Sequence, residues 1–293
     1  MYAQFFRGYL LSKEAVTPEQ LTSAISKLSD THIKLGTLAM HKGYMTASEV
    51  DEVCFLQTRE DKRFGEIAIE RCYLFEDQLE DLLVSQNPDY LILGQTLVDM
   101  GALTNAELES LMYQYQTDNE LDDYATAMAD NNTTTHLVEN FFEMYHIPAN
   151  NYTLAYINLL FNNLIRFVGE DFTPLEPMKI SEYEVNYCVA QRLSGVAKFT
   201  TALDMEPDVA VSFASRYAKM DFDAFDEYVK ASLEDFLNLH NGLFSVNMSN
   251  NSSVELNLDP PMQEEGPVMQ LNETGFVIPV IYPFGSIFLI FEF

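Results

Sequence analysis

A carboxylate and a carboxamide stand three residues apart in the run ASLEDFLNLHNG, as Asp235 and Asn238. The apolar spacing over residues 222–248 predicts one long helix, and positions i and i+3 lie on the same helix face. A carboxamide can orient a water molecule for attack on a phosphoryl group, and a carboxylate can pair with a cation beside it. Asp235 and Asn238 are therefore candidates for acting together on one partner from one helix face.

Other arrangements that carry chemistry are missing from the sequence. The histidines show no spacing typical of metal ligands; they are His32, His41, His136, His146 and His240. The cysteines form no close pair, which predicts small buried apolar residues in place of a disulfide, zinc or redox site; they are Cys54, Cys72 and Cys188. There is no glycine-rich phosphate loop and no Gly-x-Ser-x-Gly elbow. We therefore expect no metal and no cofactor held by the protein itself.

The elements expected around the candidate residues form an α+β domain over residues 150–293. Helical spacing is present at 152–168 and 207–220, before the long helix. Residues 184–193 and 196–204 predict a hairpin joined through Ser194 and Gly195. Four further strands are expected at 253–258, 268–271, 276–281 and 287–293. This order predicts a sheet with its helices on one face.

In this element order and in local sequence, residues 150–293 resemble the CheC/CheX family of chemotaxis phosphatases. The family's signature is Asp or Ser, then Glu four positions on, Asn three positions after that, and a proline about 21 residues downstream. Asp235 and Asn238 keep the spacing of the Glu and the Asn, and Pro260 follows. The chain departs from the signature where Asp235 replaces the Glu and where Ala231, beside Ser232, replaces the first residue.

The resemblance implies hydrolysis of the aspartyl phosphate on the receiver domain of a response regulator. Asn238 would position the water, Asp235 would anchor the helix against a cation, and the partner receiver would carry the Mg²⁺. Asp is shorter than Glu by one carbon, about 1.5 Å, and a misplacement of about 1 Å can cost about a hundredfold in rate. Two interpretations therefore stay open, an active phosphatase and a non-catalytic adaptor that binds a receiver.

The first part of the chain is an internal repeat. Thr17, Thr46, Phe75 and Thr104 are spaced 29 residues apart, and each follows a lead glycine, at Gly8, Gly36, Gly65 and Gly94. Each copy predicts a short helix and then a second helix, which in three copies begins at a capping box. The apolar positions four and eight residues after the Thr or Phe are expected to be buried. Residues 1–117 thus predict an all-α domain of four helical hairpins.

Residues 5–117 resemble the N-terminal domain of GspE-type secretion ATPases. The best copies of that motif are Lys-Leu-Gly at 34–36 with Gln57, and Arg-Phe-Gly at 63–65 with Gln86. In one branch of that family such a motif pair binds cyclic di-GMP, which makes Arg63 and Gln86 candidates for that ligand. The alternative is that both are exposed helix residues of a scaffold. The chain has no Gly-x4-Gly-Lys-Ser/Thr loop, so ATPase chemistry is not expected.

Charge and hydropathy bear on partners and location. Lys and Arg number 16 against 45 Asp and Glu, a net charge of −29, which repels nucleic acid and anionic lipid. Residues 118–149 are an expected acidic linker with a short helix at 136–147. The early charges at the N-terminus and the lack of a long apolar run predict a cytoplasmic protein. The apolar strand 287–293 is a candidate sheet edge for a homodimer.

Overall fold

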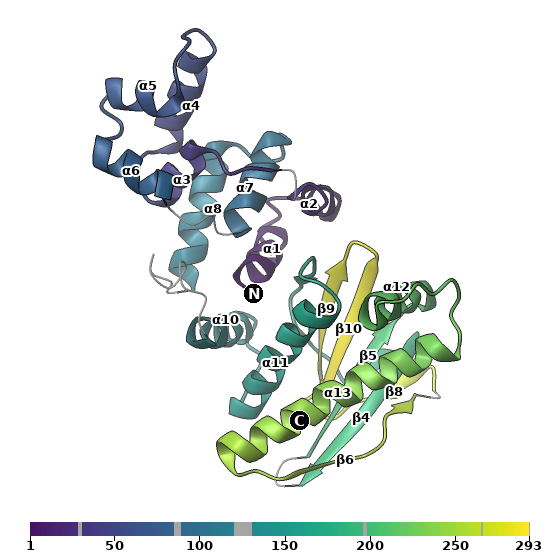
Figure 1. Ribbon diagram of the computed structural model, residues 1–293. Helices are drawn as coiled ribbons and strands as arrows, with labels where there is room; N and C mark the ends of the chain where they lie inside the picture. The colour runs from purple at the N-terminus through teal and green to yellow at the C-terminus, as the bar shows by residue number, and fades with distance from the viewer. Residues whose placement is uncertain (29–30, 85–88, 120–130, 196–197, 265, 293) are drawn as a thin grey trace. The chain divides into compact units, whose positions relative to one another are not determined.

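The computed structural model of the chain describes residues 1–28, 31–84, 89–119, 131–195, 198–264 and 266–292 (Figure 1). The chain divides into two compact units. The helical unit consists of Tyr2 and Tyr9–Thr133, and the sheet unit consists of Met1, Ala3–Gly8 and Thr134–Phe293. The expected linker at 118–149 lies partly outside the described residues, since 120–130 are not among them. The domain boundaries expected from the sequence stay a prediction.

The helical unit is built from short helices. They are α1 (Tyr2–Ser12), shared with the sheet unit, α2 (Pro18–Ile25), α3 (Leu35–His41), α4 (Ala47–Gln57), α5 (Phe64–Glu70), α6 (Glu76–Val84), α7 (Asp89–Asp99) and α8 (Asn105–Asp118). Helices α2, α4 and α8 begin at the capping boxes expected at Thr17, Thr46 and Thr104. At the fourth position the Phe75 N–H donates to Gln78 Oε1 at 3.0 Å, so half of the box survives there.

The lead glycines allow the helices of a pair to approach closely. A Cβ atom on Gly36, Gly65 or Gly94 would come within 3 Å of the side chain 14 residues later, which is Val50, Leu79 or Leu108 respectively. A Cβ on Gly8 would instead lie 2.4 Å from the carbonyl oxygen of Pro174, inside the sheet unit. The glycine of the first copy therefore serves a different contact from the other three. The stacking of the copies as a four-hairpin array stays a prediction.

In each repeat copy, the apolar residue eight positions after the Thr or Phe was expected to be buried. This expectation is only partly correct. Met112 is buried, but Cys54 and Leu83 are exposed. Helices α3 and α5, which precede the two exposed positions, have 7 residues each, whereas α7, which precedes Met112, has 11. Cys72 is also exposed, in a turn with φ 59°. The prediction of three buried cysteines is therefore wrong for two of them and right for Cys188.

The sheet unit combines helices with an antiparallel sheet, which confirms the α+β expectation. The helices are α10 (Asn131–Met144), α11 (Asn151–Phe167), α12 (Pro207–Ala218) and α13 (Glu227–Ser252). The strands are β1 (Thr173–Pro174), β2 (Met178–Lys179), β3 (Glu182–Glu184), β4 (Tyr187–Gly195), β5 (Phe199–Met205), β6 (Leu256–Leu258), β7 (Met262–Gln263), β8 (Val268–Gln270), β9 (Phe276–Tyr282) and β10 (Gly285–Glu292).

Strand order in the main sheet is β1-β9-β10-β5-β4-β6. The hairpin of β4 and β5 forms as expected, with Gln191 opposite Thr201. Strand β10 pairs with β9 on one side and with β5 on the other. The prediction that the last strand is an open edge for a homodimer is therefore wrong. Side chains on both faces of β10 are buried, as in Leu289 and Ile290, and such a strand belongs in the interior of a sheet.

The two faces of the sheet are covered differently. Helix α13 crosses the face over β4 and β5, and packs against α11 and α12 (Figure 1). The opposite face carries a smaller apolar cluster that includes Cys188, Ala190 and Met269, with Tyr183 of the β3–β8 ribbon packed on it. The helix face is where the candidate residues of α13 are positioned.

The first residues of the chain are part of the sheet unit. Arg7, 3% exposed, donates from Nη1 to the carbonyl oxygens of Glu170 at 2.9 Å and Phe172 at 3.1 Å. Gln4 Nε2 donates to the same Glu170 oxygen at 2.8 Å. The ring of Phe5 packs edge-on against Phe161 of α11 at 5.6 Å between centroids. The start of α1 thereby satisfies two carbonyl groups that precede β1, of which that of Phe172 is buried.

Candidate functional site

Helix α13 carries both candidate residues on its exposed face. Its N-terminus is capped by Asp226, whose side chain accepts from the N–H groups of Tyr228 at 3.0 Å and Val229 at 3.1 Å. The buried side is apolar apart from two residues and comprises Val229, Leu233, Phe236, Leu237, His240, Asn241, Phe244 and Met248. Asp235 and Asn238 are exposed, as expected for the i and i+3 positions opposite that apolar stripe.

Asp235 is held by the neighbouring helix. The hydroxyl of Tyr217 on α12 donates to Asp235 Oδ2 at 2.6 Å. Burial and this hydrogen bond to a carboxylate raise the pKa of Tyr217, so the phenol stays protonated and remains a donor at neutral pH. The contact restrains a short acidic side chain that would otherwise sample several rotamers.

Asn238 is held by the sheet. Gln191 on β4 donates from Nε2 to Asn238 Oδ1 at 2.9 Å and also to the backbone carbonyl oxygen of Asp259 at 2.8 Å. Asp259 directly precedes Pro260, the proline that completes the sequence signature. The backbone N–H of Asp259 donates to the Arg192 carbonyl oxygen at 3.0 Å, which ties this loop to the same strand.

A buried polar chain continues from Gln191 into the core. Asn241 Nδ2 donates to Gln191 Oε1 at 2.8 Å and to Thr201 Oγ1 at 3.2 Å. The hydroxyl of Tyr156 on α11 donates to Asn241 Oδ1 at 2.6 Å. Gln191, Asn241 and Tyr156 are each at most 1% exposed, and buried polar groups in such a chain need mutual satisfaction. The exposed amide of Asn238 is thus the outer end of a network rooted in the core.

His240 lies on the buried side of the same helix. Asn163 of α11 pairs its Nδ2 with His240 Nδ1 at 2.9 Å, and the ring packs edge-on against Tyr156. Burial lowers the pKa of His240 to about 3, because charging an imidazole without a counter-charge in the core is costly. His240 is therefore a neutral structural residue at physiological pH.

The remaining signature positions contribute little to the exposed face. Ala231 is exposed, and the hydroxyl of Ser232 donates to the Tyr228 carbonyl oxygen of its own helix at 2.8 Å. Glu234 is half-buried, one position out of register with the candidate pair. Sequence reasoning found Asp235 and Asn238 but missed Gln191 and Tyr217. A polar Gln191 between the apolar inward positions of β4 was the available signal.

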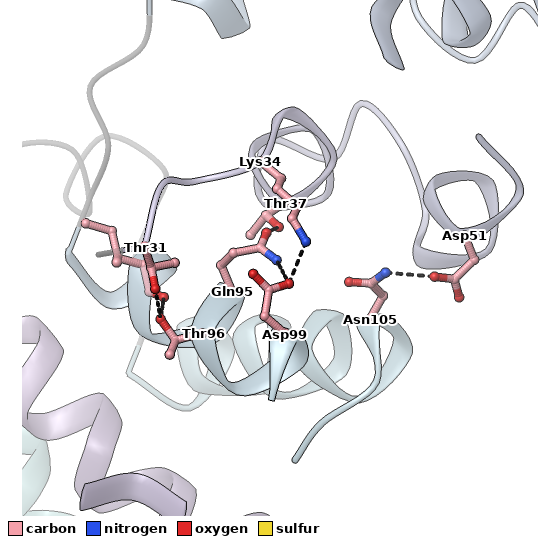
Figure 2. A network of polar contacts seen from close by, with 9 residues as sticks. Thr31, Lys34, Thr37, Asp51, Gln95, Thr96, Asp99 and Asn105 are labelled. Atoms are coloured by element: carbon pink, nitrogen blue, oxygen red, sulfur yellow. Dashed lines mark hydrogen bonds and ion pairs between the residues drawn. The ribbon is translucent and has the colours of Figure 1, made fainter. Parts of the chain in front are cut away.

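The helical unit contains a polar network among its helices (Figure 2). Lys34 Nζ lies 2.5 Å from Asp99 Oδ1, and buried Gln95 donates to the same oxygen at 2.8 Å. Thr37 is hydrogen-bonded to Gln95. In the repeat motif Lys34 occupies the position that Arg63 occupies one copy later, so this basic position serves a structural ion pair in the second copy.

The cyclic di-GMP candidates are described only in part. Arg63 is the exposed residue preceding α5, and its backbone N–H donates to Glu66 Oε2 at 2.8 Å. Gln86 lies outside the described residues. The cyclic di-GMP site stays a prediction.

The described residues contain neither a group of metal ligands nor a membrane-spanning helix. In the part of the chain that the structure covers, no three His, Cys, Asp or Glu side chains form a group that could hold a metal ion. Among those same residues, no helix has the length and hydropathy needed to cross a membrane.

Comparison with known proteins gives structural matches but no sequence matches. No protein-family profile and no curated protein sequence matches the chain. The CheX chemotaxis protein of Desulfovibrio desulfuricans matches 48% of this chain and 98% of its own, with a TM-score of 0.41 and 12% identity. A chain of the CheX–CheY–BeF3–Mg²⁺ complex from Borrelia burgdorferi matches 48% of this chain and 97% of its own, at TM-score 0.39 and 16% identity. A chain of the FliM–SpeE complex from H. pylori matches 51% of this chain and 84% of its own, at TM-score 0.33 and 11% identity. The CheC/CheX and GspE resemblances of the sequence both stay predictions.

Proposed function

We propose that the sheet unit binds the phosphorylated receiver domain of a response regulator and hydrolyses its aspartyl phosphate. The observation that carries this proposal is the exposed pair Asp235 and Asn238 on α13, each restrained by one partner, Tyr217 and Gln191. To position a water molecule, a carboxamide must be accessible to the substrate and fixed in orientation. Asn238 is exposed and restrained in this way.

The reaction needs little covalent chemistry from this chain. An aspartyl phosphate is an acyl phosphate, whose leaving group is a carboxylate. Water attacks the phosphorus, the phosphorus–oxygen bond to the receiver's aspartate breaks, and inorganic phosphate leaves. Asn238 would hold the water in line, and Asp235 would pair with a cationic side chain of the receiver. The receiver's own Mg²⁺ would neutralise charge on the phosphoryl oxygens.

The surface around the pair sets the character of the docking contact. The chain carries a net charge of −29. Docking would therefore depend on basic patches of the receiver and on complementary shape of the two surfaces. Gly242 lies one helical turn beyond Asn238, and a Cβ there would meet nothing within 4 Å. Because Gly242 has no side chain, a partner's backbone or side chain can approach the helix closely beside the Asn238 amide.

The direct test is the decay of phosphoaspartate on a panel of receiver domains, with and without the protein. We expect the wild type to accelerate decay on a cognate receiver and Asn238→Ala to abolish the acceleration while binding persists. Asn250→Ala, an exposed asparagine near the end of the same helix, is the matched control and should behave as wild type. Equal rates for wild type and Asn238→Ala on a receiver that both bind would reject the proposal.

A second candidate is an adaptor that binds a receiver without hydrolysis. The observation that favours it is the short Asp235 side chain, whose carboxylate is engaged by Tyr217 within the protein itself. Asp235→Glu separates the candidates, because it restores the reach of the family's residue. A large gain in decay rate with unchanged affinity would support the adaptor. A loss of rate would support an enzyme tuned to aspartate.

A further inference from the structure

The orientation of the Asn238 amide follows from the backbone carbonyl of Asp259, which can only accept a hydrogen bond. The carbonyl oxygen of Asp259 cannot donate, so the Gln191 atom 2.8 Å away must be the amide nitrogen. That same nitrogen lies 2.9 Å from Asn238, which must therefore present its oxygen to Gln191. The Nδ2–H2 group of Asn238 is consequently the part of the amide left for the exposed side of α13.

The inner end of this hydrogen-bond network is consistent with the same assignment. The Tyr156 hydroxyl donates to Asn241 Oδ1, so Asn241 turns its nitrogen toward Gln191 and Thr201. Gln191 then turns its oxygen toward Asn241 and its nitrogen toward Asp259 and Asn238. Reversing the amide of Gln191 or of Asn241 would leave two like groups facing each other in the core.

We propose that Gln191 is a positioning residue that holds Asn238 with its Nδ2–H2 group outward, so that Asn238 acts as a hydrogen-bond donor toward the reacting oxygens. The acceptor is an oxygen of the attacking water or of the phosphoryl group. Pro260 has a place in this arrangement, because its ring restricts the backbone of Asp259 and Asp259 supplies the carbonyl that orients Gln191. This inference rests on the proposed function for its reaction and on the hydrogen-bond chain for its geometry.

The variant that isolates the contact is Gln191→Met. Methionine matches glutamine in length and suits a buried position, but it cannot donate to Asn238 or Asp259. The matched control is Gln95→Met, the same exchange at a site that is also buried, 2% against 1% exposed, in the helical unit. Both variants lose buried hydrogen bonds, and only Gln191→Met releases Asn238.

The first measurement does not depend on activity. In ¹⁵N-labelled protein the side-chain amide signals of Asn238 are identified by their loss in Asn238→Ala, and their order parameter is measured. We expect a restrained amide in wild type and in Gln95→Met, and a value below about 0.6, typical of a flexible group, in Gln191→Met. An equally restrained Asn238 amide in Gln191→Met would overturn the inference whatever the protein does to receivers.

The second measurement is the rate of phosphoaspartate decay at saturating and at limiting protein. A released Asn238 divides its time between the two χ1 wells that are common in a helix and between two amide orientations, so we expect about a fourfold fall in the maximal rate of Gln191→Met, with half-saturation unchanged. Gln95→Met should keep the wild-type rate. A wild-type maximal rate in Gln191→Met, despite a mobile amide, would overturn the positioning role. Failure of the wild type itself to accelerate decay would reject the proposed function, and the amide measurement would still decide the geometry.

Discussion

The pH dependence of stability should reveal that His240 is buried in its neutral form. Its side chain is 0% exposed, one ring nitrogen is paired with Asn163, and burial lowers its pKa to about 3. In the unfolded chain the pKa is about 6.5. Below pH 6.5 the unfolded state therefore binds a proton that the folded state refuses, and the free energy of unfolding falls as pH falls.

The magnitude follows from the difference between these two pKa values. Each pH unit between them costs 1.36 kcal/mol, and pH 5 lies about 1.5 units below the unfolded value, so the loss from pH 8 to pH 5 is about 2 kcal/mol. The folded value of about 3 is far enough below pH 5 that the result depends little on it. The 45 acidic residues respond to pH as well, so the quantity to measure is a difference between two proteins.

The assay is urea unfolding of wild type and His240→Phe at several pH values from 8 to 5, followed through NMR signals of the sheet unit. Phenylalanine keeps the aromatic packing on Tyr156 and cannot titrate. His240→Phe should be less stable at pH 8, because Asn163 loses its acceptor. The gap should narrow by about 2 kcal/mol by pH 5. Parallel stability curves over this range would refute a buried neutral His240.

Further substitutions test other parts of the fold. Cys72→Gly should stabilise the helical unit by about 1 kcal/mol in thermal unfolding, because φ 59° strains any residue with a Cβ; Cys72→Ala should give no such gain. Gly36→Ala should destabilise by about 1–3 kcal/mol, because its Cβ would lie 2.7 Å from Val50 Cγ1. Gly242→Ala should instead stabilise the protein by up to about 1 kcal/mol, because there is open space around Gly242. If Gly36→Ala and Gly242→Ala changed the free energy of unfolding in the same direction, the close contact of Gly36 with Val50 would be contradicted. Arg7→Met should lower the stability of the sheet unit by about 3 kcal/mol, because two carbonyl groups lose a charged donor; a loss confined to the helical unit would contradict the place of α1.

Local interactions were predictable because they involve neighbours in the chain. The capping boxes at Thr17, Thr46 and Thr104 need only a hydroxyl and an acceptor three residues on. The long helix and its face could be read from apolar spacing, which places Asp235 and Asn238 on one face. The hairpin of β4 and β5 likewise depends on adjacent strands and a short turn.

Errors arose where the partner is distant in sequence. The last strand was expected to be an edge, but its neighbours β9 and β5 are set by the whole sheet. Gly8 repeats the pattern of the later glycines yet contacts Pro174. Cys54 and Leu83 repeat the position of buried Met112 yet are exposed, because burial depends on which distant residues pack against each copy.

The sequence by itself determined most of the helices, three of their caps, the longer strands and the chemical types on the exposed face of α13, since these depend on residues within a few positions of one another. Only the tertiary structure decided what holds that face in place. Gln191 meets Asn238 across 47 positions, and Tyr217 meets Asp235 across 18. No local pattern encodes such contacts, because they arise when the sheet and its helices pack and each buried donor must find an acceptor.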